Sequence, residues 1–537
     1  MASRADVIPC RAALSAASLP VLPSFLVSYM TPLRAAFSAV FVLTACQTAS
    51  GPAGTTITNV RIIDGTGVPG VAGAVRIVGD TIVAVGGAVK PARGDSVVDG
   101  QGMVLAPGFI DTHSHHTGGL ASNPGALAAV SQGITTIVGG NDGDHPMPLA
   151  ERFDSLAKSG PSINVAFYAG HGTIRSAVMG EDFKRHATTK EVDSMAVLLQ
   201  RELDAGALGL SSGLEYDPGI NSDRGEVLAL AKVAAKAGGR YISHIRSEDR
   251  WFWDAIDEII AIGREAKLPV QISHLKLAMV PLWGKTDSLF GLLNAARASG
   301  VDITADVYPY TYWQSTLQVL FPKRDFSNRA EANNILKEIA KPEGLLIGDF
   351  EANPAYKGKT VAEIAKLRNE DPASTLMGLI REAMVWEKAH GGQGSESVVA
   401  TSMDEGDIGK LLAWEHTNVC SDGGLDGAHP RGYGAFTRVL GKYVRDMQVM
   451  PLEVAIKRMT SLSAAHVGLT HRGTIAPGQF ADLVLFDPAT VADRATPAEP
   501  HLVSTGITRV WVNGRTVWQD GKTVTSQAGR MLKRQAQ

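Results

Sequence analysis

Cysteine is scarce in this chain: the 537 residues include three, Cys10, Cys46 and Cys420. Two of the three lie within or at the edge of the first 46 residues, which have the layout of a leader. After processing of this leader, Cys420 has no expected partner for an internal disulfide, because Cys46 would be the lipidated N-terminus. The stability of the chain must come from core packing, for which the length and the 45% hydrophobic content are ample.

An excess of charge of one sign is absent as well. Lysine and arginine number 51 against 54 aspartate and glutamate residues, which leaves a net charge of -3 with histidine neutral. The chain therefore has no basic field for wrapping nucleic acid and no acidic tail. It also has no glycine-rich phosphate loop of the P-loop kind. The expected partner is a small-molecule substrate and not nucleic acid.

The apolar run nearest the N-terminus, residues 35–44, is too short for a permanent membrane span and has the layout of a signal peptide. The Leu-Thr-Ala-Cys sequence that ends at Cys46 resembles the lipobox of bacterial lipoproteins, whose cysteine is lipidated. Residues 1–46 are thus predicted to be a leader, with Met30 as the true start. We expect the protein to be exported to the periplasm or to be anchored at the outer membrane. Its only expected contact with a membrane is a lipid at Cys46. An ordinary secretory signal is the alternative.

The remaining chain has short strands with glycine-containing turns at both ends, in residues 56–105 and 475–530, and these predict one small β-sandwich. Between them, apolar runs that end in polar residues alternate with helical stretches, the rhythm of a parallel sheet covered by helices. Eight runs, the number that closes a (β/α)8 TIM barrel, lie at 104–110, 134–138, 163–168, 208–214, 241–245, 270–275, 301–307 and 418–420. The sequence predicts an α/β protein with its barrel at 106–474.

The spacing of these runs is interrupted once. The seventh and eighth runs lie much farther apart than the others, which predicts an insertion at about 320–395. A lid over the site and an irregular excursion of the chain are both open interpretations.

Histidines follow three of the predicted strands. His113 and His115 come at the end of the first run, and the period of two in a strand directs both side chains the same way. His244 and His274 end the fifth and sixth runs, and Asp422 follows the eighth. Because barrel enzymes carry their chemistry at the C-terminal ends of the strands, these groups are expected to meet. Imidazole with carboxylate suits one or two zinc ions.

Several segments resemble a known family. The order of an HxH pair on strand 1, histidines on strands 5 and 6 and an aspartate on strand 8 is similar to the amidohydrolase superfamily. Within it, six segments are similar to the D-aminoacylase, or N-acyl-D-amino-acid deacylase, group: GFIDTHSH (108–115), GHGTIR (170–175), GLSSGLEY (209–216), SHLK (273–276), DVYPY (306–310) and HPRGYG (429–434). The resemblance covers most of the chain beyond the leader.

The resemblance implies a bridging ligand between two metals, and this chain departs from the family there. The superfamily commonly uses a carboxylated lysine on strand 4, but no lysine occurs between Lys190 and Lys232. Glu215 stands at the end of that strand and is the predicted bridging carboxylate. Some D-aminoacylases use a cysteine after strand 2, where this chain has none, and Asp142 is a reserve candidate there.

The implied reaction is amide hydrolysis by a metal-activated water, with Asp422 moving the proton to the departing nitrogen. Substrates of the group carry a carboxylate next to the scissile amide, which guanidinium and ammonium groups would bind. The candidates for substrate binding are Arg246, Lys276, Tyr308, Arg431 and His171.

Three functions remain open from the sequence. The first is hydrolysis of N-acyl-D-amino acids. The second is the same chemistry on dipeptides or cyclic amides, as in hydantoinases and dihydroorotases. The third is a non-catalytic surface lipoprotein that binds a ligand. The presence of Asp422 beside the histidines argues against this third function.

Overall fold

The computed structural model describes residues 52–392, 394–524 and 527–534. The predicted leader, residues 1–46, lies outside these ranges. Across the ranges described, none of the helices combines the length and the apolar character that a membrane crossing requires.

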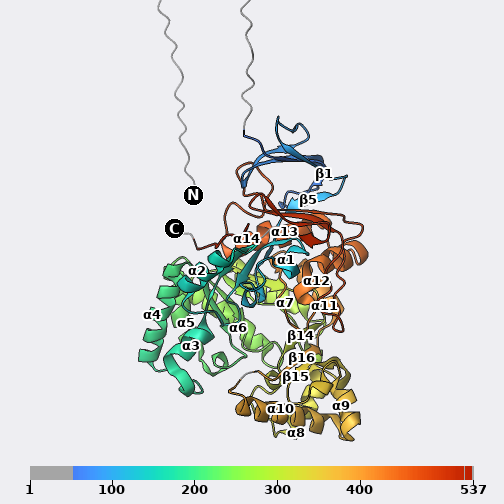
Figure 1. Ribbon diagram of the computed structural model, residues 1–537. Coiled ribbons are helices and arrows are strands. Elements are labelled where there is room, and N and C mark those ends of the chain that lie inside the picture. Colours follow the sequence, from blue (N-terminus) through green and yellow to red (C-terminus); the bar gives the residue numbers. More distant parts are fainter. Residues whose placement is uncertain (1–51, 393, 525–526, 535–537) are drawn as a thin grey trace, which may run out of the picture. The chain divides into compact units, whose positions relative to one another are not determined.

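Eight parallel strand positions form the predicted TIM barrel (Figure 1). They are β6 (Phe109–Asp111), β7 (Ile134–Gly139), β8 (Asn164–Phe167) with its continuation β9 (Ala169–Gly170), β10 (Gly209–Gly213), β11 (Arg240–His244), β12 (Val270–Ile272), β13 (Ile303–Val307) and β17 (Thr417–Val419). Beyond the end of the eighth strand, the backbone N–H of Asp422 donates to the carbonyl of His113 at 2.9 Å, which joins the last strand to the first. The loops that carry the predicted site residues are therefore neighbours.

Helices alternate with the strands and pack their apolar faces on the barrel. In α6 (Phe252–Ala266), buried Ile256, Ile259 and Ile260 recur at helical spacing while Asp257 is exposed. The other helices that follow the barrel strands are α1 (Leu127–Val130), α2 (Leu149–Ser159), α3 (His171–Met179), α4 (Thr189–Ala205), α5 (Arg224–Lys236), α7 (Thr286–Ala298), α11 (Glu405–Ala413), α12 (Arg431–Arg438), α13 (Leu452–Met459) and α14 (Ser461–Val467).

The two ends of the described chain share one mixed sheet. Its strands are β1 (Thr55–Ile62), β2 (Val71–Val78), β3 (Thr81–Gly86), β4 (Ser96–Asp99), β5 (Val104–Pro107), β18 (Leu483–Phe486), β19 (Ile507–Val512), β20 (Arg515–Gln519) and β21 (Lys522–Thr523). The strands hydrogen bond continuously, and Ile82 of β3 bonds back to Gln479, so the sheet folds over its own core. The small β domain is thus one continuous hydrogen-bonded sheet, built from both chain ends as predicted, that folds over a shared apolar core.

The first predicted run, 104–110, is divided between the two parts of the protein. Residues of β5 pair with β18 in the terminal sheet, whereas β6 pairs with β7 in the barrel. Gly108 separates them, and a Cβ there would lie 2.3 Å from the side chain of Thr135. An apolar pattern alone does not show this change of partner.

The insertion after the seventh strand has secondary structure of its own and is not an irregular excursion. Three antiparallel strands, β14 (Tyr312–Ser315), β15 (Leu345–Phe350) and β16 (Glu396–Thr401), pair in the order β14-β16-β15. Helices α8 (Arg329–Asn334), α9 (Val361–Arg368) and α10 (Pro372–Ala389) accompany them (gold in Figure 1). The insertion is wider than the predicted 320–395, because β14 and β16 pair with each other across the intervening chain.

A buried polar network joins the barrel to the terminal sheet at Asp482. Its carboxylate forms an ion pair with Arg472 and accepts hydrogen bonds from the backbone of Asn513 at 2.7 Å and from the amide of Asn164, in β8, at 3.1 Å. Both charged side chains are at least 96% buried. Removal of one member of such a pair leaves the other charge uncompensated.

We expect Asp482→Ala to lower the free energy of unfolding by about 3–5 kcal/mol, because the Arg472 guanidinium would stay buried without its partner. The matched control is Asp80→Ala, which breaks another Arg–Asp pair of the terminal sheet, Asp80–Arg530, whose side chains are 35% and 45% exposed. Its expected cost is about 1 kcal/mol or less. Denaturant unfolding measures both, and equal costs for the two variants would contradict this account.

Candidate metal centre and active site

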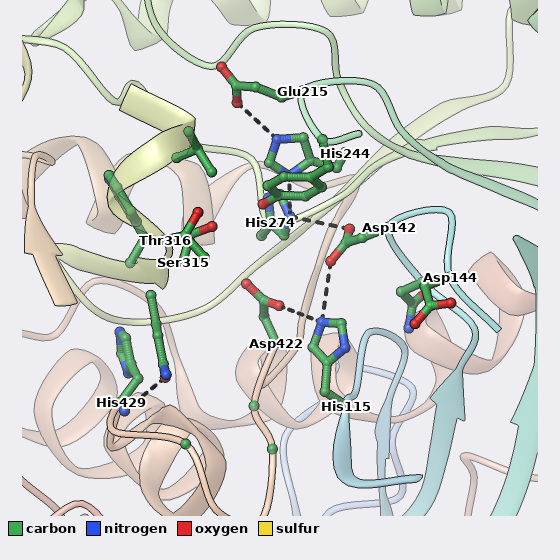
Figure 2. Close-up of a pocket in the computed structure, with 18 of the residues that line it drawn as sticks. His115, Asp142, Asp144, Glu215, His244, His274, Ser315, Thr316, Asp422 and His429 are labelled. Carbon is green, nitrogen blue, oxygen red and sulfur yellow. Dashed lines mark hydrogen bonds and ion pairs between the residues drawn. The ribbon is translucent and has the colours of Figure 1, made fainter. Parts of the chain in front are cut away.

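A cavity of about 1030 Å³ opens at the C-terminal ends of the barrel strands. The barrel loops line one part of it and the insertion lines the rest, through residues of β14, of the turn that follows it and of β16. The insertion therefore forms a wall of the site, as the lid interpretation requires. Figure 2 shows the polar side chains gathered in this cavity.

The HxH pair faces two carboxylates. His115 Nε2 lies 3.1 Å from Asp422 Oδ1 and 3.2 Å from Asp142 Oδ2. His113 Nε2 lies 3.1 Å from the same oxygen of Asp142 and 3.4 Å from that of Asp422. The four groups thus direct their ligand atoms at one point, with all these atoms within 4.8 Å of one another.

The histidines of strands 5 and 6 form a second group. His244 Nδ1 and His274 Nε2 are 3.0 Å apart, and His274 Nε2 is 3.5 Å from Asp142 Oδ1. Asp142, His244 and His274 again place one ligand atom each within 4.8 Å of the others. All four predicted histidines therefore meet at the mouth of the barrel.

Asp142, and not Glu215, lies between the two groups. One oxygen of Asp142 faces the HxH pair and the other faces His274, as the dashed lines in Figure 2 show. Glu215 lies 2.9 Å from the outer nitrogen of His244 and forms a separate possible ligand group with His244 and Glu248, away from the HxH pair. The sequence analysis ranked these two carboxylates in the opposite order, because the position of a loop after strand 2 is not visible in a strand pattern.

The donor set fits a divalent cation. Buried Asp142 Oδ1 and His113 Nδ1 have no hydrogen-bond partner within the part of the chain that is described. Burial disfavours the charged imidazole of His113, yet the carboxylates of Asp142 and Asp422 hold its pKa well above the usual value. Burial likewise opposes ionisation of Asp142, but His113 holds the pKa of that carboxyl well below its usual range. A bound divalent cation would take the place of the protons that otherwise balance the charge of these carboxylates.

Three of these residues have left-handed backbone conformations: φ is 53° at Asp142, 34° at His274 and 49° at Asp422. Such conformations cost on the order of 1–3 kcal/mol each and cluster at functional sites. The surrounding loops hold them in place. The backbone N–H of His274, for example, donates to Asp306 at 2.6 Å, and Asp306 is fully buried.

Three predicted substrate-binding residues lie together beside the metal groups. Arg431 Nη1 donates to Asp422 Oδ2 at 2.5 Å, and Lys276 Nζ lies 2.6 Å from both oxygens of Glu248. The ring of Tyr308 stands near both cations, 4.9 Å from the Arg431 guanidinium and 5.7 Å from the Lys276 ammonium. The Tyr308 hydroxyl is buried and has no partner among the residues described.

Glu248 lines the cavity and pairs with Lys276, and it is absent from the residues predicted from the sequence. Burial opposes the charge of both partners, yet the Lys276 ammonium lowers the pKa of Glu248 and Glu248 raises the pKa of Lys276. The lysine also approaches His274 Nδ1 at 2.8 Å and so orients that imidazole. The available signal was the spacing of four residues between His244 and Glu248.

The structure does not bring the other two candidates to this cavity. Arg246 forms a two-point ion pair with Glu258 at 2.8 and 2.9 Å, on a separate surface depression. His171 Nε2 donates to the Glu226 carboxylate at 2.7 Å in a buried network with Arg175. Both residues follow strand ends in the sequence, but their side chains turn toward the helices.

Comparisons with known proteins agree with this geometry. The sequence profile of the amidohydrolase family matches residues 96–518. A D-aminoacylase and an N-acyl-D-glutamate deacylase of Alcaligenes xylosoxydans xylosoxydans are each 35% identical to the chain, over 88% of it and over 96% and 95% of their own lengths.

Solved structures give the same result. A D-aminoacylase crystal structure superposes with a TM-score of 0.79 at 34% identity, covering 90% of this chain and all of its own. The N-acyl-D-glutamate deacylase of Bordetella bronchiseptica, solved with zinc and a phosphonate that mimics the tetrahedral intermediate, has a TM-score of 0.78 at 33% identity and covers 89% of this chain and 99% of its own. These matches, together with the barrel and the convergent histidines, show that the chain belongs to the amidohydrolase family.

Proposed function

We propose that this protein is a zinc-dependent hydrolase that cleaves N-acyl-D-amino acids to a carboxylate and a free D-amino acid. The observation that carries the proposal is the convergence of His113, His115, His244 and His274 on Asp142 and Asp422. Relatives at 35% identity that act on N-acyl-D-amino acids support the substrate class.

The residues that would hold the metal fall into two overlapping groups that share Asp142, and Glu215, His244 and Glu248 form a third set of possible ligands. His113, His115, Asp142 and Asp422 form one, and Asp142, His244 and His274 form the other, so one or two ions fit. A bound divalent cation lowers the pKa of water toward about 7 and polarises a carbonyl oxygen. The nitrogen and oxygen donors are those that zinc prefers.

In this proposal Asp422 moves the proton. Its Oδ1 lies at the point where the HxH pair converges, and Arg431 holds Oδ2, so the carboxylate has a fixed orientation. Arg431, together with the histidines, keeps the pKa of Asp422 well below its usual range despite burial. The carboxylate accepts the proton of the attacking water at Oδ1 and gives it to the departing nitrogen, which is a poor leaving group without it.

The carboxylate of the substrate is assigned to Lys276, Tyr308 and Arg431. The unpartnered Tyr308 hydroxyl can donate one hydrogen bond, and the guanidinium can offer its remaining N–H groups. Because these residues lie beside Asp422, a carboxylate held there places the adjacent amide at the histidine cluster. The acyl group then points away from them.

The test is hydrolysis of enantiomeric N-acetyl amino acids by zinc-loaded and chelated protein. We expect the zinc form to hydrolyse the D enantiomers, chelation to abolish the activity and added zinc to restore it. Dipeptides and hydantoins serve as alternative substrates in the same assay. Turnover of those without turnover of N-acetyl-D-amino acids would replace the proposed substrate class, and no turnover of any amide by the zinc form would favour a binding protein.

The position of Asp142 leads to a second expectation. Asp142→Asn removes the charge shared by the two groups and should lower the zinc content of the purified protein, measured by elemental analysis. Glu215→Gln is the comparison variant, since Glu215 contacts His244 and does not lie between the two groups that Asp142 joins. It should retain zinc at the content of the unaltered protein. Loss of zinc in Glu215→Gln alone would restore the ranking from the sequence.

We also propose that the protein is exported and carries a lipid at Cys46. The support is the leader pattern of the sequence, since residues 1–46 lie outside the described ranges. Mass spectrometry of the processed protein from a bacterial membrane fraction should find an N-terminus at a lipid-modified Cys46. An unmodified N-terminus at another residue would favour the ordinary secretory signal.

A further inference from the structure

A buried acid in the insertion is not used by the proposed reaction. Glu396, the first residue of β16, is 7% exposed and lines the same cavity as the metal groups. Its Oε1 accepts a hydrogen bond from the backbone N–H of Leu317 at 2.7 Å. Its Oε2 has no hydrogen-bond partner in the described ranges, and the neighbouring Ser397 hydroxyl, which also lines the cavity, has none either.

Three apolar side chains of the insertion line the same cavity as this polar pair. Val319, Leu320 and Ile339 line the cavity together with Glu396, and Leu320 and Ile339 are 3% exposed. No carboxylate or cation of the metal groups lies in hydrogen-bond contact with Glu396 among the residues described. The insertion wall therefore combines an apolar surface with two unsatisfied oxygens.

Burial raises the pKa of Glu396 to about 8, the Leu317 amide opposes this rise, and the Glu387 carboxylate of α10 adds to it. Glu387 accepts hydrogen bonds from Ser395 and brings no positive charge. The carboxyl group is thus mostly protonated at pH 7, and a cation that reached it would favour its ionised form.

We propose that Glu396 and Ser397 end a side-chain subsite that favours N-acyl-D-amino acids with a long cationic side chain. The aliphatic stem would pack on Val319, Leu320 and Ile339, as the stems of lysine side chains do on apolar surfaces. The ammonium would donate to Glu396 Oε2 and Ser397 Oγ, the two atoms that lack partners. The inference rests on the proposed function and specifies its substrate.

The geometry of the cavity supports this assignment. Figure 2 shows Ser315 and Thr316 of the insertion on the side of the cluster opposite Asp144. The proposed carboxylate site includes Tyr308, which precedes the insertion, and Arg431. Glu396 and Arg431 line the same cavity, so the inference places the α-carbon of a substrate anchored there beside the insertion wall, with its side chain and not its acyl group directed at Glu396.

The test compares Nα-acetyl-D-lysine with Nα-acetyl-D-norleucine, which has the same carbon chain without the ammonium. The readout is the ratio of their kcat/KM values, because a change in the folded or metal-loaded fraction cancels in a ratio. We expect a ratio of about 10 or more at pH 8 for the unaltered protein, as a desolvated charge-assisted contact would give.

The pH dependence of this ratio has a defined sign. Binding of the ammonium ionises Glu396, so the ratio should rise by up to about tenfold per pH unit below pH 8 and level off above it. The lysine ammonium stays charged over pH 6–9. This profile needs only the unaltered protein, so it tests the inference even where a variant fails to fold.

Glu396→Gln keeps an oxygen for the Leu317 amide and removes the ionisable group. In this variant we expect a ratio near one that does not change between pH 6 and 9. Glu351→Gln is the matched control, because Glu351 is an exposed acid of the same insertion that does not line the cavity. It should keep the ratio and the pH profile of the unaltered protein.

Two results would overturn the inference alone: both substrates turned over with a ratio at or below one at pH 8, or a high ratio at pH 8 that survives Glu396→Gln. Turnover of neither substrate would instead remove the proposed function, and the subsite with it. The two failures are therefore distinguishable in one experiment.

Discussion

The Asp142 carboxylate is the constraint on which the rest of this site depends. Its two oxygens face histidines from opposite sides of the barrel mouth, so it ties the first strand to the sixth across the open end. Buried imidazole and carboxylate groups at these separations are stable only when protons or a cation balance them. The left-handed backbone conformations of Asp142 and Asp422 lower the stability of the fold, and the surrounding contacts hold both residues in place despite this cost.

Around this centre, each charged group has a second contact that fixes its direction. Arg431 orients Asp422, and the pair of Lys276 and Glu248 orients His274. Such outer contacts set the orientation of ligands and tune their basicity. The insertion completes the enclosure from the seventh strand, and it adds polar groups of its own to a cavity that the barrel alone would leave open.

Much of the architecture could be predicted from local pattern. The eight apolar runs, the small β domain from both chain ends and the four histidines at strand ends all follow from periodicity and from the rule that parallel strands end at one face of a barrel. The extent of the insertion could not be predicted this way, because β14 and β16 are far apart in sequence and pair only after the chain folds.

The sequence by itself determined which side chains can reach the barrel mouth, since strand periodicity directs His113 and His115 to one side whatever their surroundings. Tertiary structure alone decided which carboxylate joins the histidines and which cations face the cavity. Asp142 and Glu215 both follow strands and line the cavity, yet Asp142 is the one that lies between the two histidine groups. Arg246 and Lys276 also follow strands, and of these two Lys276 faces the cavity. Loop conformation sets that direction, and it depends on contacts between segments that no local pattern contains.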